Sequence, residues 1–231
     1  MSDNNNVLKL TGTVKETELA YTDEEKGEKF YRIFIETTRL SDSVDVLPVN
    51  VSEKLLYDIN CEPGDLVSIN GYVRTRNFSD EEGHSHLEVF GYAYKIYNVE
   101  PDDIDPKTNN IVRITGVICR PVRHRKTLKT QREVTDLVVA VNRPYRRRDY
   151  IPCITWSRNA ILASNRSVGD MIQITGRFQD RQYRKRDVEE VLTTYEVSVN
   201  DLTVLEPVMQ EDEELLTEPV EKEMIEEQKE E

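Results

Sequence analysis

The chain has 231 residues, 37% of them hydrophobic and 32% charged, and its formal net charge is −13. This length allows one large domain or two domains of about 100 residues each. The sequence contains no apolar run long enough to cross a bilayer, and its polar start does not fit a secretory signal. The cysteines, Cys61, Cys119 and Cys153, are isolated, so we expect no disulfide framework and a cytoplasmic location.

Charge is unevenly distributed along the chain. Residues 1–106 contain 10 Lys or Arg and 22 Asp or Glu, whereas residues 107–205 contain 19 and 10. Residues 206–231 are acidic again, with 2 Lys or Arg and 12 Asp or Glu. A net charge of −13 argues against a nucleic-acid partner only if it is spread evenly. The basic middle part therefore permits such a partner.

Five β-branched or aromatic runs with alternating polarity predict five strands in the first part of the chain. These runs lie at residues 7–14, 30–38, 44–51, 66–75 and 86–96. Between the third and fourth runs, Leu55, Leu56 and Ile59 favour one short helix within residues 52–60. Gly64 follows that segment, at a turn that requires a left-handed residue.

Residues 101–109 separate the first part from the second. Two prolines and several acids, as in EPDDIDP at 100–106, predict an extended and poorly ordered linker. Asp102, Asp103 and Asp105 resemble a cluster of metal ligands, but acids of this kind in a spacer are usually solvated. We therefore expect no metal site here.

The second part repeats the first. The segment NVLKLTGTV at 6–14 returns as NIVRITGVI at 110–118, and residues 61–78 return at 166–183, with a constant offset of 104 or 105. Strands are predicted at residues 112–118, 135–142, 150–156, 171–178 and 195–202, with a short helix in SRNAILASNRS at 157–167. The chain therefore consists of two copies of one domain.

Three strands, a short helix and two more strands form the order of an OB-fold, a small five-stranded barrel. We therefore predict an all-β protein with two tandem OB-folds, at residues 1–100 and 110–206. Residues 207–231 are predicted to form a disordered acidic tail, because they are too polar to build a core. Glycines inside the strand patterns predict bulges or tight barrel bends at Gly12, Gly71, Gly116 and Gly176.

Motifs for catalysis are missing from the sequence. It has no glycine-rich phosphate loop, no nucleophile elbow and no paired CxxC motif. His84 and His86 form an H-x-H pair in a polar loop, but no third ligand is near them in sequence. Cys153 lies in an apolar strand and is interpreted as a core thiol. We predict that the protein is not an enzyme and binds no cofactor.

The second copy interleaves basic and aromatic residues. Cations that follow phosphates and rings that stack on bases are what a single-stranded nucleic acid requires. Candidates occur in the loop between strands two and three, after strand three, and along strand four into its hairpin: Tyr145, Arg146, Arg147, Arg148, Tyr150, Trp156, Arg158, Arg177, Arg181, Tyr183, Arg184, Lys185 and Arg186.

Some of these residues have a second interpretation. Trp156 fits a core position as well as a stacking position. Charges on both sides of Tyr183 favour an exposed ring. In the loop after the first strand of the second copy, a group of basic residues either widens the positive surface or aids solubility. These are Arg120, Arg123, Arg125, Lys126 and Lys129.

Residues 132–186 resemble the bacterial and phage single-stranded DNA-binding proteins. The resemblance is carried by a strand ending in A-V-N, then W-x-R-N-A at 156–160, G-D at 169–170, and R-x-Y at 181–183. In the first copy, GYVRTRNF at 71–78 is similar to the family's G-x-x-R-T-R-x-aromatic strand. The whole chain is similar to a tandem form of this family. On the matching positions, the resemblance implies base stacking by Tyr145, Tyr150, Trp156 and Tyr183, with Phe78, Arg74 and Arg76 as weaker counterparts.

The resemblance implies a protein that coats single-stranded DNA during replication, recombination or repair and lies with the nucleoid. Family members commonly present four OB-folds, which two tandem chains would supply as a homodimer. The first copy is acidic and lacks an aromatic residue before its third strand, so we expect it to bind DNA poorly and to act in assembly. The sequence ends in EEQKEE without the family's apolar tip, so we do not expect the usual route of partner recruitment.

Two other functions remain open from the sequence. An OB-fold adaptor of a primosome or recombination complex would use the basic patch to hold an acidic protein. A single-stranded RNA binder would use the same rings, because stacking does not depend on the sugar. A nuclease is disfavoured, since the sequence has no credible metal cluster.

Overall fold

The computed structural model describes residues 5–79, 82–128, 130–184 and 191–206. The predicted tail at 207–231 and the candidate residues Lys129, Lys185 and Arg186 lie outside these ranges. Within them, no helix has the length and apolar character needed to span a membrane.

The first barrel consists of β1 (Asn6–Asp23), β2 (Glu28–Thr38), β3 (Val44–Ser52), β4 (Leu66–Ser79) and β5 (Ser85–Asn98). β1 pairs with both β2 and β4, β2 pairs with β3, β4 pairs with β5, and a short parallel contact between β3 and β5 closes the barrel. Alternate residues face inward, and Leu8, Leu10, Ile33 and Ile69 are fully buried. This is the predicted OB-fold order.

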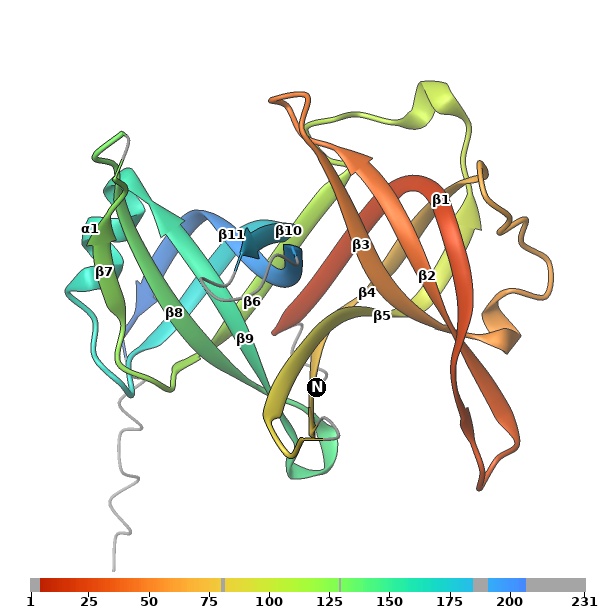
Figure 1. Cartoon of the computed structure of the whole chain (residues 1–231), viewed down its shortest axis with the longest axis horizontal. Coiled ribbons are helices and arrows are strands. Elements are labelled where there is room, and N and C mark those ends of the chain that lie inside the picture. The colour runs from red at the N-terminus through yellow and green to blue at the C-terminus, as the bar shows by residue number, and fades with distance from the viewer. Residues whose placement is uncertain (1–4, 80–81, 129, 185–190, 207–231) are drawn as a thin grey trace, which may run out of the picture.

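The second barrel repeats this pairing. It consists of β6 (Asn110–Ile118), β7 (Arg123–Lys126), β8 (Glu133–Asn142), β9 (Arg148–Trp156), α1 (Ser157–Ser164), β10 (Met171–Arg184) and β11 (Val191–Leu205). β6 pairs with β8 and β10, and a parallel contact between β9 and β11 closes this barrel. The prediction of two tandem OB-folds is confirmed, and Figure 1 shows the two barrels side by side.

The interval after β6 differs from its predicted form. We expected a loop there, but Arg123–Lys126 forms β7 and pairs with β8. Oppositely charged side chains face each other across the two strands, with 2.9 Å between Lys126 Nζ and Glu133 Oε1 and 3.0 Å between Arg125 and Asp136. Such cross-strand pairs stabilise a short ladder. The basic residues of this interval therefore lie partly on a strand.

The short helix expected between strands three and four forms fully only in the second barrel, as α1. In the first barrel it is a single 3-10 turn, η1 (Glu53–Leu55), whose first residues are capped by the side chain of Ser52. The chain leaves the helical path by Asn60, whose backbone N–H and C=O both bond the side chain of Asn98. A tertiary partner thus replaces the helical hydrogen bonds there.

Residues 101–109 are more ordered than a solvated linker. Pro101–Asp103 forms a 3-10 turn, η2, with a capping box between Glu100 and Asp103. Asp105 then accepts the N–H of Lys107 through its side chain and that of Asn109 through its carbonyl. Asn109 is buried, and its side chain donates to the carbonyl of Thr38. Proline at the start of a turn and an Asx turn explain why this acidic segment does not extend.

The two barrels are joined by an antiparallel pairing of β1 with β6, at the centre of Figure 1. Leu8 lies opposite Val112, which is its own equivalent under the repeat offset of 104. Asn6 opposite Ile114 is mirrored by Asn110 opposite Leu10. The barrels therefore meet as two subunits of a two-fold dimer would, within one chain.

Gly71 and Gly176 confirm the predicted bulges, since the register of β4 with β5 and of β10 with β11 shifts at these two residues. A Cβ at Gly176 would overlap the carbonyl oxygen of Ser198 on the neighbouring strand. Gly64 and Gly169 have the predicted left-handed backbone, with φ of +102° and +104°.

Replacing Gly176 by alanine is therefore expected to destabilise the protein by about 1–3 kcal/mol, because the two strands must separate to admit the methyl group. Urea unfolding followed by circular dichroism would measure this loss. A midpoint equal to that of the wild type would contradict the close strand approach.

Candidate nucleic-acid interface

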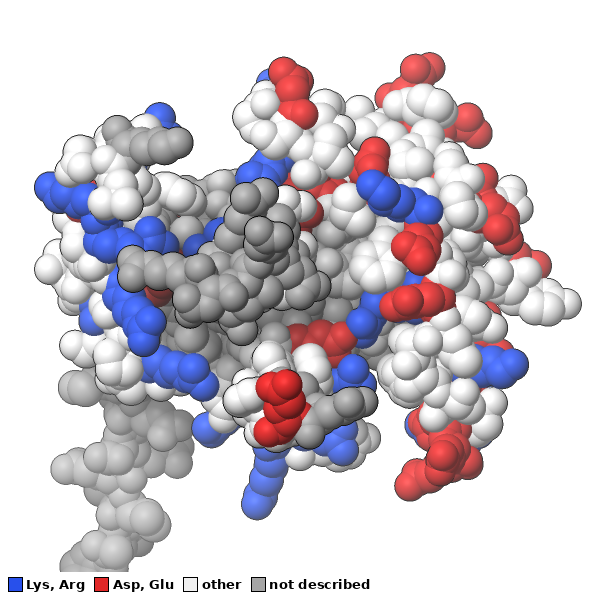
Figure 2. Space-filling model, viewed as in Figure 1, with Lys and Arg blue, Asp and Glu red and all other residues white. Residues whose placement is uncertain are grey.

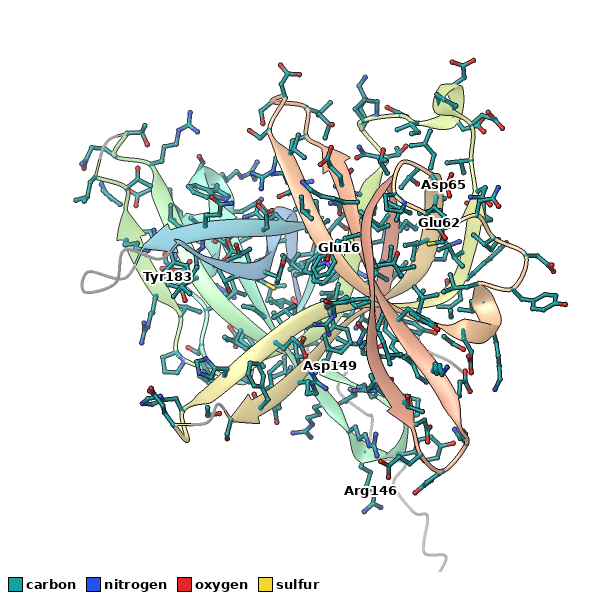
Figure 3. All side chains as sticks on the ribbon, turned by 45° about the vertical axis from the view of Figure 1, so that its right-hand side comes forward. Glu16, Glu62, Asp65, Arg146, Asp149 and Tyr183 are labelled. Carbon is teal, nitrogen blue, oxygen red and sulfur yellow. The ribbon has the colours of Figure 1, made fainter. Side chains whose placement is uncertain are left out.

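Three of the candidate residues, Tyr145, Arg146 and Arg147, lie at the tip between β8 and β9. Tyr145 is 95% exposed, and it and Arg146 both have a left-handed backbone, with φ of +60° and +57°. Two such non-glycine residues in a row are costly, which is typical of a segment shaped for binding. A hydrogen bond from Arg143 N–H to the Arg147 carbonyl closes the tip. In Figure 3 Arg146 projects from its end.

The cations of this tip are available for an external anion. Among the described residues, no carboxylate lies within ion-pair distance of Arg146 or Arg147, and Arg148 donates only to the neutral side chain of Asn142. Arg143 instead turns inward toward Asp149, and burial lowers its pKa.

Tyr150 and Trp156 lie on the same exterior face of β9. Arg148 was expected in the preceding loop but begins the strand, which includes Tyr150 as its predicted range does. Tyr150 and Trp156 are 37% and 38% exposed, so each presents part of its ring to solvent. The two residues are six positions apart along the strand, which is roughly 20 Å. Arg158 follows in α1 and is exposed, without a carboxylate partner in the part of the chain that the structure describes.

The candidate residues of β10 divide into two groups. Tyr183 is 44% exposed near the end of the strand, far from Arg146 in Figure 3. Arg181, on the same face, pairs with Glu196 at 3.3 Å, and burial raises the pKa of that carboxyl group. Arg177, in contrast, is half-buried beside Arg39 and Asp45 of the first barrel, and burial lowers its pKa. Arg184 ends the strand, and its side chain is not among those described.

The first barrel reaches the candidate surface through its β4–β5 hairpin. Phe78 is 45% exposed there and stacks on His86, with 5.3 Å between ring centroids. The backbone N–H of Tyr150 donates to Thr75 Oγ1 at 2.9 Å. A cavity of about 280 Å³ lies between the barrels, lined among others by Asn77, His86, Leu87, Cys119, Arg120 and Tyr150. The surface around Tyr150 is therefore formed by both barrels.

The candidate arginines of the first barrel are already paired. Arg74 lies 2.8 Å from Asp149, whose side chain is fully buried, and its guanidinium also lies over the ring of Tyr72. Arg76 lies 2.8 Å from Glu88. Arg74 and Asp149 are 75 positions apart, so no local pattern could predict their contact, whereas Arg76 and Glu88 lie opposite each other in the β4–β5 hairpin.

The sequence reasoning missed an aromatic group in the first barrel. Tyr21 of β1 stacks on Phe30 of β2, with 4.7 Å between centroids and nearly parallel rings, and Phe30 also contacts Tyr92. Tyr21 is 38% exposed. The alternation of FYRIF at 30–34 indicated that Phe30 and Arg32 share a face of the strand, but not that this face meets Tyr21.

The two barrels differ in surface charge. Figure 2 shows Lys and Arg side chains along the second barrel, whereas Asp and Glu are more frequent over the first barrel. Within the described residues there is no group of three or more His, Cys, Asp or Glu that could hold a metal ion. Cys153 is buried in the core, as predicted.

Comparisons with known proteins agree with this arrangement. The model of the single-strand binding protein family matches residues 109–205, the second repeat. Single-stranded DNA-binding protein 1 of Streptococcus pyogenes is 33% identical over 105 residues, which cover 42% of this chain and 78% of that protein.

Two crystal structures share the fold over most of this chain. The wild-type single-stranded DNA binding protein from Thermus aquaticus has a TM-score of 0.68 and 21% identity, over 87% of this chain and 93% of that one. A deletion mutant of the same protein also has a TM-score of 0.68, with 22% identity over 90% and 98% of the two chains. From the matched second repeat and the relative from Streptococcus, the chain belongs to the single-strand binding protein family.

Proposed function

We propose that this protein is a non-catalytic single-stranded DNA-binding protein that coats and protects single strands during replication, recombination or repair. The observation that carries the proposal is the exterior of the second barrel, where exposed rings alternate with arginines, most of which have no carboxylate partner among the described residues. Each stacked base contributes about 1–3 kcal/mol, so three rings with several phosphate contacts suffice for tight binding.

The proposed binding residues fall into a main set and a supporting set. Stacking is assigned to Tyr145, Tyr150, Trp156 and Tyr183, and phosphate contact to Arg146, Arg147, Arg148, Arg158 and Arg181. From the sequence alone, phosphate contact is also assigned to Arg184, Lys185 and Arg186. Phe78 supports it from the first barrel.

We further propose a division into a first domain at 1–100, a linker at 101–109, a second domain at 110–206 and an acidic tail at 207–231. The second domain holds most of the binding surface, and the first contributes its hairpin and the β1–β6 junction. A homodimer of the chain would present four barrels. The support for it is that the two barrels of one chain already pair about a pseudo-two-fold axis, an arrangement that two chains can repeat.

Titration with oligo-dT of increasing length tests the function. Trp156 is the only tryptophan, and its half-exposed ring should lose fluorescence as bases stack on it. Affinity should fall with salt, with a slope of about −0.7 in the logarithms for each phosphate neutralised. Measuring the mass of the free protein in solution in the same samples would test the homodimer.

Matched RNA oligonucleotides separate the two nucleic acids, since a binder of RNA would prefer them. A protein that shows neither quenching nor a salt-dependent association with any single strand would contradict the proposal and favour the adaptor function.

A further inference from the structure

A carboxylate of the first barrel is held between two arginines on its exterior. Glu88 of β5 lies directly opposite Arg76 of β4 in the strand register. Its Oε2 accepts from Nε and the terminal nitrogen of Arg76 at 2.9 and 2.8 Å. Its Oε1 lies 2.6 Å from a terminal nitrogen of Arg32. The side chain of Glu88 is only 16% exposed.

Arg32 is fixed from several sides. Its Nε donates to Asn50 Oδ1 at 3.1 Å, and Asn50 is buried in β3. Its guanidinium carbon lies 5.7 Å from the centroid of the Phe90 ring. With a side-chain exposure of 17%, Arg32 cannot turn away to seek another anion without losing these contacts. The pair with Glu88 is therefore a built contact rather than a loose surface ion pair.

Two guanidinium groups that converge on one carboxylate form the arrangement that also binds a phosphate group. A ring face lies beside them. Burial raises the pKa of the Tyr21 hydroxyl, and Arg76 is close enough to oppose that rise. The exterior of the first barrel thus holds two cations and a half-exposed ring, with an internal anion where a phosphate would lie.

The second barrel differs at the equivalent register position. There Arg181 lies opposite Thr194, as Arg76 lies opposite Glu88. Glu196 forms an ion pair with Arg181. Among the described residues of that barrel, however, no carboxylate bridges two exterior arginines. The repeat therefore offers a natural replacement for Glu88.

We propose that Glu88 is a specificity-determining residue that occupies the phosphate position of a latent nucleic-acid site on the first barrel and keeps that site closed. This inference rests on the proposed function, which it deepens. It explains why a barrel with arginines and rings is expected to bind DNA poorly. Single strands are thereby directed to the second barrel.

Glu88→Gln tests the proposal in the full-length chain. It retains size and shape and removes the charge that holds Arg32 and Arg76. We expect a longer occluded site on oligo-dT and a salt dependence steeper by about 0.7 for each further phosphate neutralised. Glu62→Gln makes the same change in net charge at an exposed loop residue before β4, and it should bind as the wild type does.

Two further variants keep the test decisive. Glu88→Thr introduces the residue that the second barrel has at this register position, and it should give the same gain as Glu88→Gln. It replaces Glu88→Gln in the test if glutamine disturbs the hairpin. Adding Arg32→Gln and Arg76→Gln to Glu88→Gln should remove the gain. Thermal unfolding of each variant verifies that it is folded.

The outcomes separate the two hypotheses. If the wild type binds oligo-dT and both Glu88 variants show its site length and salt slope, the assignment of Glu88 is wrong and the proposed function stands. If the triple variant still shows the longer site and the steeper salt slope, the proposal that phosphate binds between Arg32 and Arg76 is wrong. If the wild type binds no single strand, the proposed function fails first.

Discussion

Replacing Trp156 by alanine is expected to weaken oligo-dT binding by about 1–3 kcal/mol, or roughly 5- to 150-fold. Its ring is part of the exterior of β9 and 38% exposed, so truncation removes a stacking surface rather than a core side chain. Tyr150→Ala should have a similar effect on the same strand. The two rings are roughly 20 Å apart, so their effects should add and the double variant should lose about 2–6 kcal/mol.

Fluorescence anisotropy with labelled oligo-dT would measure these losses and does not depend on the tryptophan. Tyr57→Ala is a suitable control, because Tyr57 is 89% exposed in the first barrel and lies outside the proposed surface. It should bind as tightly as the wild type. Unchanged affinity in the double variant, with its fold intact, would remove the stacking assignment for β9.

The fold could be predicted because its determinants are local and are repeated. Burial alternates along the first halves of β1 and β4 and along most of β6 as the sequence predicts, and Gly64 and Gly169 mark equivalent turns. Even the hydrogen bonds repeat. Gly64 donates to the Val14 carbonyl and Gly169 to the Ile118 carbonyl, both at 2.9 Å. A pattern of period two and a left-handed glycine are visible in any single sequence.

The arrangement of the candidate site was only partly predictable. Residue types were identified correctly as basic and aromatic, but their partners come from strands far away in the sequence. Arg177 was grouped with the open surface, whereas it lies half-buried against the first barrel. Glu88 gave no signal, because its role depends on Arg32, 56 positions earlier and two strands away in the barrel. Such contacts follow from barrel closure, which single-sequence patterns do not encode.

Replacing Asp149 by alanine is expected to destabilise the whole chain by about 3–5 kcal/mol, the cost of removing one partner of a buried ion pair. The Asp149 side chain is fully buried at the contact between the barrels, where Figure 3 shows it. Its carboxylate accepts from Arg74 at 2.8 Å and from the backbone N–H of Thr75 at 3.0 Å, both in the first barrel. Arg143 approaches it at 3.4 Å from its own barrel. Alanine would leave these donors without their acceptor.

The repeat supplies an internal comparison for this variant. Asp45, equivalent to Asp149 under the offset of 104, accepts from Arg39 and from the backbone N–H of Asp180 in the other barrel. Asp45→Ala should therefore cost a similar amount. Asp149→Asn keeps an acceptor for the Thr75 N–H but loses the charge and the oxygen that accepts from Arg74, so its loss should be intermediate.

Chemical denaturation of the three variants, with Asp136→Ala as control, measures these differences. Asp136 pairs with Arg125 on the surface at 33% exposure, so its removal should cost no more than about 1 kcal/mol. If Asp149→Ala unfolds at the same denaturant concentration as Asp136→Ala, the contact does not stabilise the junction of the barrels. If it unfolds in two separate transitions, the pair instead couples two barrels that are each stable alone, and the loss belongs to their association.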